Sequence, residues 1–249
     1  MTPPLPRSTG PRMYCDLALA QGAEVALPEA AARHAVSVLR LQVGATLNLF
    51  NGEGGEYRAA LVAVNKRETR ARLLEFDATE RESPLDVTLA LGISAGERMD
   101  YSLQKATELG VTSIQPLATE RSVVKLAGER ADKRLQHWQH VVIAACEQCG
   151  RNRVPAVAPV QKLFAYLADV DRGKRLLMLS PDASTPLKQV APTAGVILLI
   201  GAEGGLAPAE YQAAQASGFE PVKLGPRILR TETAPVAALA VLQALWGDL

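Results

Sequence analysis

The sequence predicts an α/β protein in which a small β-barrel-like domain precedes a larger domain of alternating strands and helices. Between residues 13 and 76, short runs alternate apolar and polar residues, which is typical of half-buried strands. From residue 85 onward, short apolar runs are separated by amphipathic segments with helical spacing. This second rhythm indicates a parallel sheet covered by helices.

Composition sets the broad class of the protein. The chain has 249 residues, of which 48% are hydrophobic, enough for one large domain or two ordinary ones. The net charge of +1 neither indicates nor excludes nucleic acid, because a local basic patch is sufficient for binding. Three cysteines do not make an even disulfide set, so a cytoplasmic location is expected. No apolar run approaches the roughly 20 residues that span a bilayer, and no signal peptide is seen, so no membrane partner is expected.

The expected small domain covers residues 1–76. Residues 1–12 are rich in proline and polar residues and are expected to form a flexible arm. Strands are expected at "ATLNLF", "EYRAALVAV" and "ETRARLLEF", with the turn "NGEGG" between the first two and a helix at "LPEAAARHAVSVLR". The segment "DATERESP", residues 77–84, is polar and ends in proline, so we interpret it as the linker.

The second domain is expected to cover residues 85–249. Buried strands are predicted at "LDVTLALG", "SIQPLA", "KRLLMLS" and "GVILLI". Helices are predicted at "GERMDYSLQKATELG", "ERADKRLQHWQHVVIAACEQCG", "PAEYQAAQASG" and "TAPVAALAVLQALW". In such sheets ligands bind at the carboxyl ends of the strands, so the segments that follow these strands are the candidate sites.

The first candidate site is the glycine-rich segment "LLIGAEGGLAPAE", which follows a buried strand. Glycines there allow backbone amides to approach a ligand closely. The segment lacks the Lys-Ser/Thr of a Walker loop and the spacing of a dinucleotide-binding fingerprint. A plain turn between strand and helix remains the alternative.

The second candidate site is "LGPRILRTETA", directly before the last helix. Gly225-Pro226 supplies a turn, and Thr231 or Thr233 is expected to cap the helix. Arg227, Arg230 and Glu232 have no evident structural purpose. The alternative is a solvated ion pair at the start of a helix. Two glycine-containing loops after strands, close together in the sequence, favour a shared pocket.

The segment "HWQHVVIAACEQC" imitates a zinc-ligand set, but helix geometry opposes a metal site. In one helix, the ends of this segment would lie roughly 18 Å apart along the axis at about 1.5 Å per residue. Zinc–ligand bonds are only about 2.0 to 2.3 Å long, so the four side chains could not converge. We expect no metal, and buried or half-buried helix residues instead.

Basic residues are scattered over both expected domains. A small β-domain with scattered arginines, joined to an α/β domain, is a reasonable arrangement for docking RNA. A solvated charged surface is the alternative. The candidate RNA-binding residues are Arg12, Arg33, Arg40, Arg151 and Arg153.

Several segments resemble one known family along nearly the whole chain. They are "HAVSVLRLQVG", "NGEGGEY", "GERMDYSLQKATELGV", "PLATERSVVK", "CEQCGRNRVP", "LLIGAEGG" and "LGPRILRTETA", in this order. The chain resembles the bacterial 16S rRNA uridine-N3 methyltransferases of the SPOUT class. One departure is Ala202, where the family usually has proline. This change is expected to loosen the loop and to alter cofactor affinity at most.

The resemblance implies a fold, a cofactor and partners. The fold would be a PUA-like N-terminal domain followed by a SPOUT domain with a trefoil knot. The protein would form a homodimer, bind S-adenosylmethionine and act on 16S rRNA of the small ribosomal subunit. By position, the cofactor residues would be Leu179, Ser180, Pro181, Ile200, Gly201, Glu203, Gly204, Gly205, Leu224, Gly225, Ile228, Leu229, Arg230, Thr231, Thr233 and Ala234.

The chemistry of uracil suggests roles for two of these side chains. N3 of uracil carries an imide proton and has no free nucleophilic lone pair, so methylation requires removal of that proton. Glu232 would serve as the base, and Arg230 would stabilise the negative charge on the two carbonyl oxygens. Glu97 or a water remains open as the base.

Other functions remain as alternatives. One is a SPOUT methyltransferase acting on another RNA, such as tRNA. Another is a non-catalytic rRNA-binding assembly factor, which the intact Glu203, Arg230 and Glu232 oppose. An enzyme acting on a small nucleotide is disfavoured by the missing phosphate-loop lysine.

Overall fold

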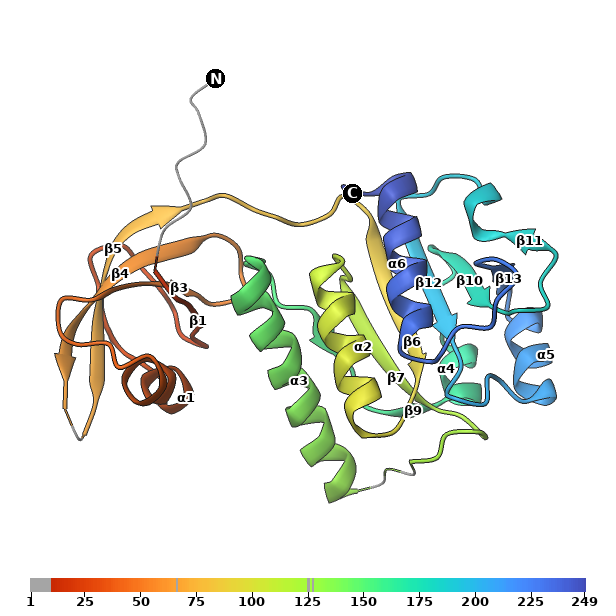
Figure 1. Ribbon diagram of the computed structural model, residues 1–249, viewed down its shortest axis with the longest axis horizontal. Helices are drawn as coiled ribbons and strands as arrows, with labels where there is room; N and C mark the ends of the chain where they lie inside the picture. The colour runs from red at the N-terminus through yellow and green to blue at the C-terminus, as the bar shows by residue number, and fades with distance from the viewer. Residues whose placement is uncertain (1–9, 66, 125, 127) are drawn as a thin grey trace. The chain divides into compact units, whose positions relative to one another are not determined.

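The computed structural model describes residues 10–65, 67–124, 126 and 128–249 (Figure 1). Its contacts divide the chain into two compact units. The first unit contains residues 1–82 and 146–154, and the second contains residues 83–145 and 155–249. The expected flexible arm lies mostly outside the described residues, and the expected domain boundaries stay predictions.

The first unit is built around a five-stranded sheet. Its elements are β1 (Arg12–Tyr14), β2 (Glu24–Ala26), α1 (Glu29–Arg33), the π-helix η1 (His34–Val38), β3 (Thr46–Phe50), β4 (Glu56–Val64) and β5 (Thr69–Asp77). The strand order is β1-β3-β4-β5-β2. Alternate residues of the strands point into the core, among them Leu47, Leu49, Ala59, Leu61 and Leu73, all almost fully buried.

A buried polar network, here called the Arg12 network, ties residues 146–154 to this sheet. The Arg12 Nε donates to Glu56 at 2.6 Å, and its Nη1 donates to the Cys146 carbonyl at 2.6 Å. Its Nη2 donates to Asn152 Oδ1 at 2.5 Å and to the Arg151 carbonyl at 3.1 Å. Burial of this charge is tolerated because the guanidinium is paired and hydrogen-bonded. The last turn of the long helix α3 therefore belongs to the first unit.

The second unit is an eight-stranded sheet with helices. Its strands are β6 (Asp86–Gly92), β7 (Ser113–Ala118), β8 (Ala156–Val157), β9 (Gln161–Lys162), β10 (Arg175–Leu179), β11 (Thr185–Pro186), β12 (Gly195–Ile200) and β13 (Glu220–Lys223). Its helices are α2 (Gly96–Glu108), α3 (Glu129–Cys149), α4 (Leu163–Ala168), the 3-10 helix η2 (Leu187–Gln189), α5 (Pro208–Ala216) and α6 (Thr233–Trp246). The strand order is β11-β13-β10-β12-β6-β7-β8, with β9 beside β7. All of these pairings are parallel, which confirms the predicted α/β class.

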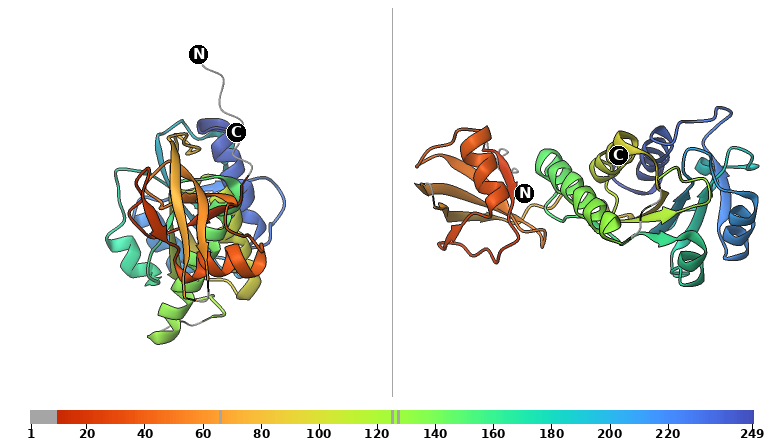
Figure 2. Two further views of the ribbon diagram at one scale, coloured as in Figure 1. Left: turned by 90° about the vertical axis from the view of Figure 1, so that its left-hand side faces the viewer. Right: turned by 90° about the horizontal axis from the view of Figure 1, so that it is seen from below.

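Helices cover both faces of this sheet (Figures 1 and 2). On one face, Ile197 and Leu199 of β12 pack with Leu163 and Leu167 of α4 and Ala214 of α5. On the other face lie α2 and α6, which contact each other. Because side chains of a strand alternate, the central strands must be apolar on both faces, as β6 and β12 are.

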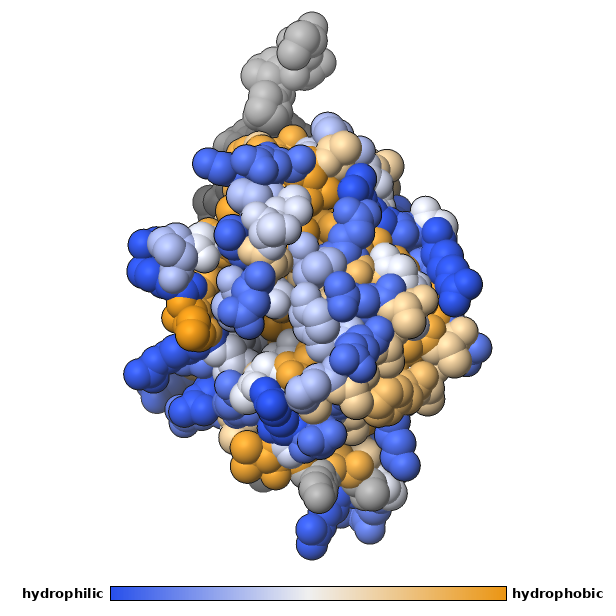
Figure 3. Space-filling model, turned by 90° about the vertical axis from the view of Figure 1, so that its right-hand side faces the viewer, coloured by the Kyte–Doolittle hydropathy of each residue, from blue (hydrophilic) through white to orange (hydrophobic). Residues whose placement is uncertain are grey.

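The surface of the second unit mixes polar and apolar side chains. Figure 3 shows hydrophilic residues over most of one face, with hydrophobic ones gathered toward its lower right. Large exposed apolar side chains of this unit include Val123, Phe164 and Ile228. Among the described residues, no helix combines the length and the apolar content that crossing a membrane requires.

Candidate active site

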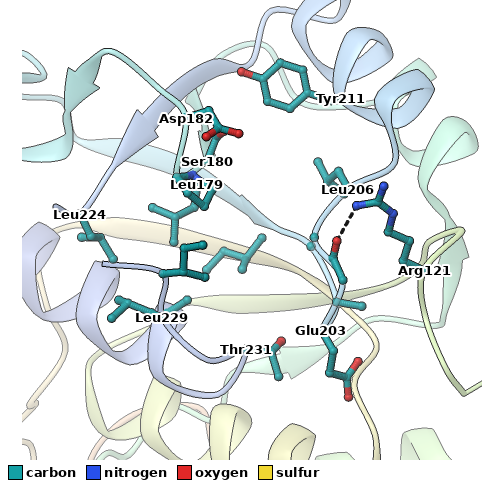
Figure 4. A pocket seen from close by; sticks show the side chains of 18 of the residues that line it. Arg121, Leu179, Ser180, Asp182, Glu203, Leu206, Tyr211, Leu224, Leu229 and Thr231 are labelled. Atoms are coloured by element: carbon teal, nitrogen blue, oxygen red, sulfur yellow. Dashed lines mark hydrogen bonds between the residues drawn. The ribbon is translucent and has the colours of Figure 1, made fainter. Parts of the chain in front are cut away.

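A cavity of about 700 Å³ opens at the carboxyl ends of three neighbouring strands of the second unit. These strands are β13, β10 and β12, which are adjacent in the sheet. The loops that follow them, residues 179–182, 200–208 and 224–234, form most of its wall (Figure 4). The cavity thus lies where parallel α/β sheets bind ligands.

Most of the residues predicted to bind a cofactor line this cavity. They are Leu179, Ser180, Pro181, Ile200, Gly201, Glu203, Gly204, Gly205, Leu224, Gly225, Ile228, Leu229, Thr231 and Ala234. Arg230 and Thr233, which were also predicted, are not among the lining residues. The sheet therefore brings together segments that are up to 55 positions apart in the chain, from Leu179 to Ala234.

Ala202 and Arg227, which lie in the two candidate segments, line the cavity as well. The lining residues that sequence reasoning missed are Arg121, Asp182, Leu206, Pro208, Tyr211 and Gln212. Asp182 and Leu206 directly neighbour predicted residues, and Pro208, Tyr211 and Gln212 follow within seven positions of Gly205, so a wider window around the loops would have included them. Arg121 is different, because it follows β7 and reaches the cavity only through the order of the strands in the sheet.

Close backbone packing explains two of the glycines around the loop after β12. A Cβ atom on Gly92, the last residue of β6, would lie 2.3 Å from the Ala202 nitrogen. A Cβ on Gly201 would lie 2.6 Å from the Gly205 carbonyl carbon. Gly205 itself has φ +69°, a conformation that L side chains rarely adopt. The loop is thus a tight turn pressed against the end of the neighbouring strand.

Glu203 connects this loop to the start of α2. Its Oε1 accepts a hydrogen bond from the Ala95 N–H at 2.9 Å and lies 3.6 Å from an Arg98 Nη1. A carboxylate at this position is favoured by the partial positive charge of the helix N-terminus. The other oxygen, Oε2, is buried and has no hydrogen-bond partner. Glu203, which lines the cavity, therefore has one oxygen fixed by the protein and one buried oxygen without a hydrogen-bond partner.

The loop before α6 differs from the expectation in its cap. The N-cap residue is Glu232, and no side chain caps the helix. The Arg230 carbonyl instead accepts the N–H groups of Thr233 and Ala234, both at 3.0 Å. The prediction that Thr231 or Thr233 caps α6 was wrong, because this carbonyl satisfies the first amides. The Thr231 Oγ1 is buried without a partner, beside the cavity (Figure 4).

The two predicted catalytic side chains flank Thr231 in the chain. Arg230 is exposed and Glu232 is half-buried. Neither lines the cavity, whereas Thr231 between them does. Their catalytic roles stay predictions.

The predicted RNA-binding arginines fall into two groups. Arg33, Arg40 and Arg153 are exposed, and Arg40 has an unusual φ of 55° just after the π-helix. Arg12 is mostly buried in the Arg12 network, with its side chain 13% exposed, and Arg151 is buried in an ion pair with Glu82. Both guanidiniums are bonded to protein groups, and the RNA-binding role of all five arginines stays a prediction.

The predicted metal-like segment lies in one continuous helix, α3, as the geometric reasoning required. Cys146 is buried and Cys149 half-buried, as expected, but His137 and His140 are exposed, so the expectation was wrong for the two histidines. His137 bonds Asp100 at 2.8 Å. In the described part of the chain, no group of three or more His, Cys, Asp or Glu side chains could hold a metal ion.

Comparison with known proteins places this site in a family. Residues 81–243 match the RNA methyltransferase domain family, and residues 27–74 match the RNA methyltransferase PUA domain. A "Ribosomal RNA small subunit methyltransferase E" of Buchnera aphidicola is 32% identical over 96% of this chain and 98% of its own length. The chain belongs to the ribosomal RNA small subunit methyltransferase E family. A second family member, from Synechocystis, is 38% identical over 90% of this chain and 74% of its own.

Solved structures of relatives have the same architecture. The family member from Neisseria gonorrhoeae, bound to S-adenosyl methionine, has a TM-score of 0.90 at 43% identity. It covers 96% of this chain and 99% of its own. A Legionella pneumophila protein, solved with the bound cofactor SAM, has a TM-score of 0.92 at 38% identity and covers 97% of this chain and 100% of its own. The predicted fold class, with its N-terminal PUA domain, is thereby confirmed.

Proposed function

We propose that this chain transfers the methyl group of S-adenosylmethionine to N3 of one uridine in 16S rRNA of the small ribosomal subunit. Family membership supports the reaction class. The observation that carries the proposal for this chain is the cavity at the ends of β10, β12 and β13, whose lining includes 14 of the 16 predicted cofactor residues.

The residues of the cavity suit S-adenosylmethionine chemically. Leu179, Ile200, Leu224 and Leu229 offer apolar surface to an adenine ring. The ribose hydroxyls, the amino groups and the carboxylate of the cofactor need polar partners, and the buried, unpartnered Thr231 Oγ1 and Glu203 Oε2 can supply some of them. The cofactor brings an electrophilic methyl group on a sulfonium sulfur.

The chain must activate N3 of the uracil. Glu232 accepts the imide proton from N3, and the nitrogen then forms its bond to the methyl carbon while the carbon–sulfur bond breaks. S-adenosylhomocysteine and a protonated carboxyl are left, and the carboxyl returns its proton to water. Arg230 donates hydrogen bonds to the carbonyl oxygens on which negative charge develops. Glu97, exposed in the first turn of α2, or a water remains the alternative base.

RNA would be held by exposed side chains of the first unit. In the first unit, Arg33 and Arg40 flank the exposed Val38 and Leu39, and Arg153 is exposed as well. Such guanidiniums bind phosphates, and the apolar neighbours can contact sugars and bases. A π-helix and a residue at positive φ in one short segment are features that occur often at functional sites.

Further properties follow the family resemblance. We propose a cytoplasmic homodimer with a trefoil knot and no metal, divided into a PUA-like domain at 1–76, a linker at 77–84 and a SPOUT domain at 85–249. Ile228 lines the cavity yet is 83% exposed, which supports a second copy of the chain covering it. Analytical ultracentrifugation would test the dimer.

The deciding experiment is methyl transfer from labelled S-adenosylmethionine to small ribosomal subunits that lack the modification, with the nucleosides identified by mass. We expect 3-methyluridine. Glu232→Gln and Arg230→Ala should each lower kcat about 100-fold or more while cofactor binding persists. Wild-type turnover in both variants would refute the roles of these residues. Cofactor binding without transfer would favour another RNA substrate or a non-catalytic assembly factor.

A further inference from the structure

Glu210 is a buried carboxylate beside the cavity that does not line it. It lies in the first turn of α5 and is only 2% exposed. Its Oε2 accepts the Ala207 N–H at 2.9 Å, and its Oε1 accepts the Glu120 N–H at 2.8 Å. Buried carboxylate oxygens are usually hydrogen-bonded, and here both are.

These two bonds, here called the Glu210 bridge, join two loops that follow different strands. Ala207 ends the loop after β12, and Glu120 belongs to the turn after β7. The turn is closed on itself as well, because the Ser122 N–H donates to the Thr119 carbonyl at 3.1 Å and the two hydroxyls lie 2.9 Å apart. The Glu210 bridge therefore fixes a compact turn against the glycine loop.

Arg121 extends this connection into the cavity wall. It directly follows Glu120, and its Nη1 donates to the Gly204 carbonyl at 2.6 Å (Figure 4). Its side-chain carbons lie 3.0 to 3.5 Å from the position that a Cβ on Gly204 would occupy. The Arg121 side chain therefore packs directly across Gly204, where the glycine leaves it room.

We propose that Glu210 is a positioning residue for the cofactor pocket, acting through the turn at 119–122 and through Arg121. Glu210 fixes the backbone at Ala207 directly and the turn that carries Arg121. Arg121 in turn fixes the carbonyl of Gly204. The loop after β12 is thus held at Gly204 and at Ala207. The Glu210 carboxylate sets the position of both contacts. This inference rests on the proposed function only in naming S-adenosylmethionine as the ligand.

The isosteric change Glu210→Gln tests the bridge. An amide has one acceptor oxygen, and its NH₂ would face one of the two backbone N–H groups, so one loop is released. We expect the dissociation constant for S-adenosylmethionine, measured by calorimetry, to rise about tenfold or more. Glu220→Gln is the matched control, because Glu220 is an exposed carboxylate paired with Arg175 on the same sheet. It should leave the constant unchanged.

Coupling with Arg121 separates positioning from general stability. Arg121→Met should also weaken binding, and Arg121→Lys, which keeps a donor for the Gly204 carbonyl, should recover part of the loss. In the double variant Glu210→Gln/Arg121→Met the losses should not add, because both side chains act on the same loop. Fully additive losses, or wild-type binding by Glu210→Gln, would overturn the proposal.

Amide hydrogen exchange without ligand gives an independent readout. In Glu210→Gln, exchange should accelerate at residues 119–122 and 201–207 and stay unchanged in the first unit. Unchanged exchange in both loops contradicts the bridge. If the wild-type protein fails to bind S-adenosylmethionine, the proposed function is wrong while the exchange result still decides the bridge. If Glu210→Gln does not fold, the cofactor affinities of Arg121→Met and Arg121→Lys are compared instead. Equal affinities would mean that the loop after β12 does not depend on the turn at 119–122.

Discussion

Gly92 lets two backbones pass closer together than any side chain allows. A Cβ there would meet the Ala202 nitrogen at 2.3 Å and the Gly201 carbonyl carbon at 2.7 Å, and neither backbone atom can move aside easily. Gly92→Ala should therefore lower the free energy of unfolding by about 1 to 3 kcal/mol and weaken cofactor binding. Urea unfolding and calorimetry would measure both. Gly195→Ala is the control, since it meets only the flexible Lys174 side chain at 3.2 Å. Equal effects of the two variants would contradict this view.

By the family resemblance, Ala202 occupies a position where proline is expected. Its nitrogen packs against Gly92, a residue without a side chain, at 2.3 Å from the position a Cβ would take there. Ala202→Pro should therefore be accepted and should raise the free energy of unfolding by about 0.4 to 1 kcal/mol, because proline restricts the unfolded chain. Thermal unfolding would show the gain, and cofactor affinity should rise or stay equal. A loss of stability would mean that the Ala202 backbone is incompatible with proline.

Among single residues, those of the site could be predicted from the sequence when they lie in a glycine-containing loop after a strand. Gly201 and Gly225 mark such loops in the sequence. Glu210 and Arg121 were not predictable as parts of one arrangement, because nothing local shows that β7, β6 and β12 are consecutive in the sheet. The buried end of Arg12 was likewise hidden, since an arginine near the chain start suggests a solvated charge.

At the scale of elements, the Arg12 network binds the end of α3 to the first unit. Arg12→Met should lower the free energy of unfolding of this unit by about 3 to 5 kcal/mol, because Glu56, whose side chain is 6% exposed, keeps a buried charge without its cation. Arg58→Met is the control. It removes an exposed ion pair with Glu75 and should change the free energy of unfolding by less than about 1 kcal/mol. Denaturant unfolding, monitored by amide hydrogen exchange in residues 12–77, would compare the two variants. A small effect of Arg12→Met would show that water replaces the lost partner.

Longer elements were predictable and short ones were not. The strands β3, β4, β6 and β12 and the helices α2 and α6 carry clear periodic patterns, and the structure confirms them. Strands of two to four residues, such as β8, β11 and β13, are too short to show a period and are fixed by their neighbours. The predicted helix near residues 27–40 divides into α1 and the π-helix η1, and Arg40 takes a positive φ as the chain turns out of it.

For the whole molecule, two buried thiols make the stability of the folded protein depend on pH in alkaline solution. Burial raises the pKa of Cys15 and of Cys146 from 9.0 to about 12. The unfolded chain therefore loses these protons first, so stability falls as the pH rises from about 9 toward 12. Unfolding measured between pH 8 and 11 should show this decline, and Cys15→Ala should reduce its slope. At pH 8, a thiol reagent should modify Cys149 first, and rapid reaction of all three thiols in the folded protein would contradict the burial.

The Arg12 network also imposes an order on synthesis. Arg12 reaches the Cys146 carbonyl across 134 positions of the chain. At about 5 to 20 residues per second, a ribosome would need roughly 7 to 27 s to add the residues between them. Arg12 and Glu56 would leave the exit tunnel long before their remaining partners exist. The first unit therefore cannot be completed when residue 82 emerges, and its nascent sheet must wait without these partners until residues 146–154 have been made.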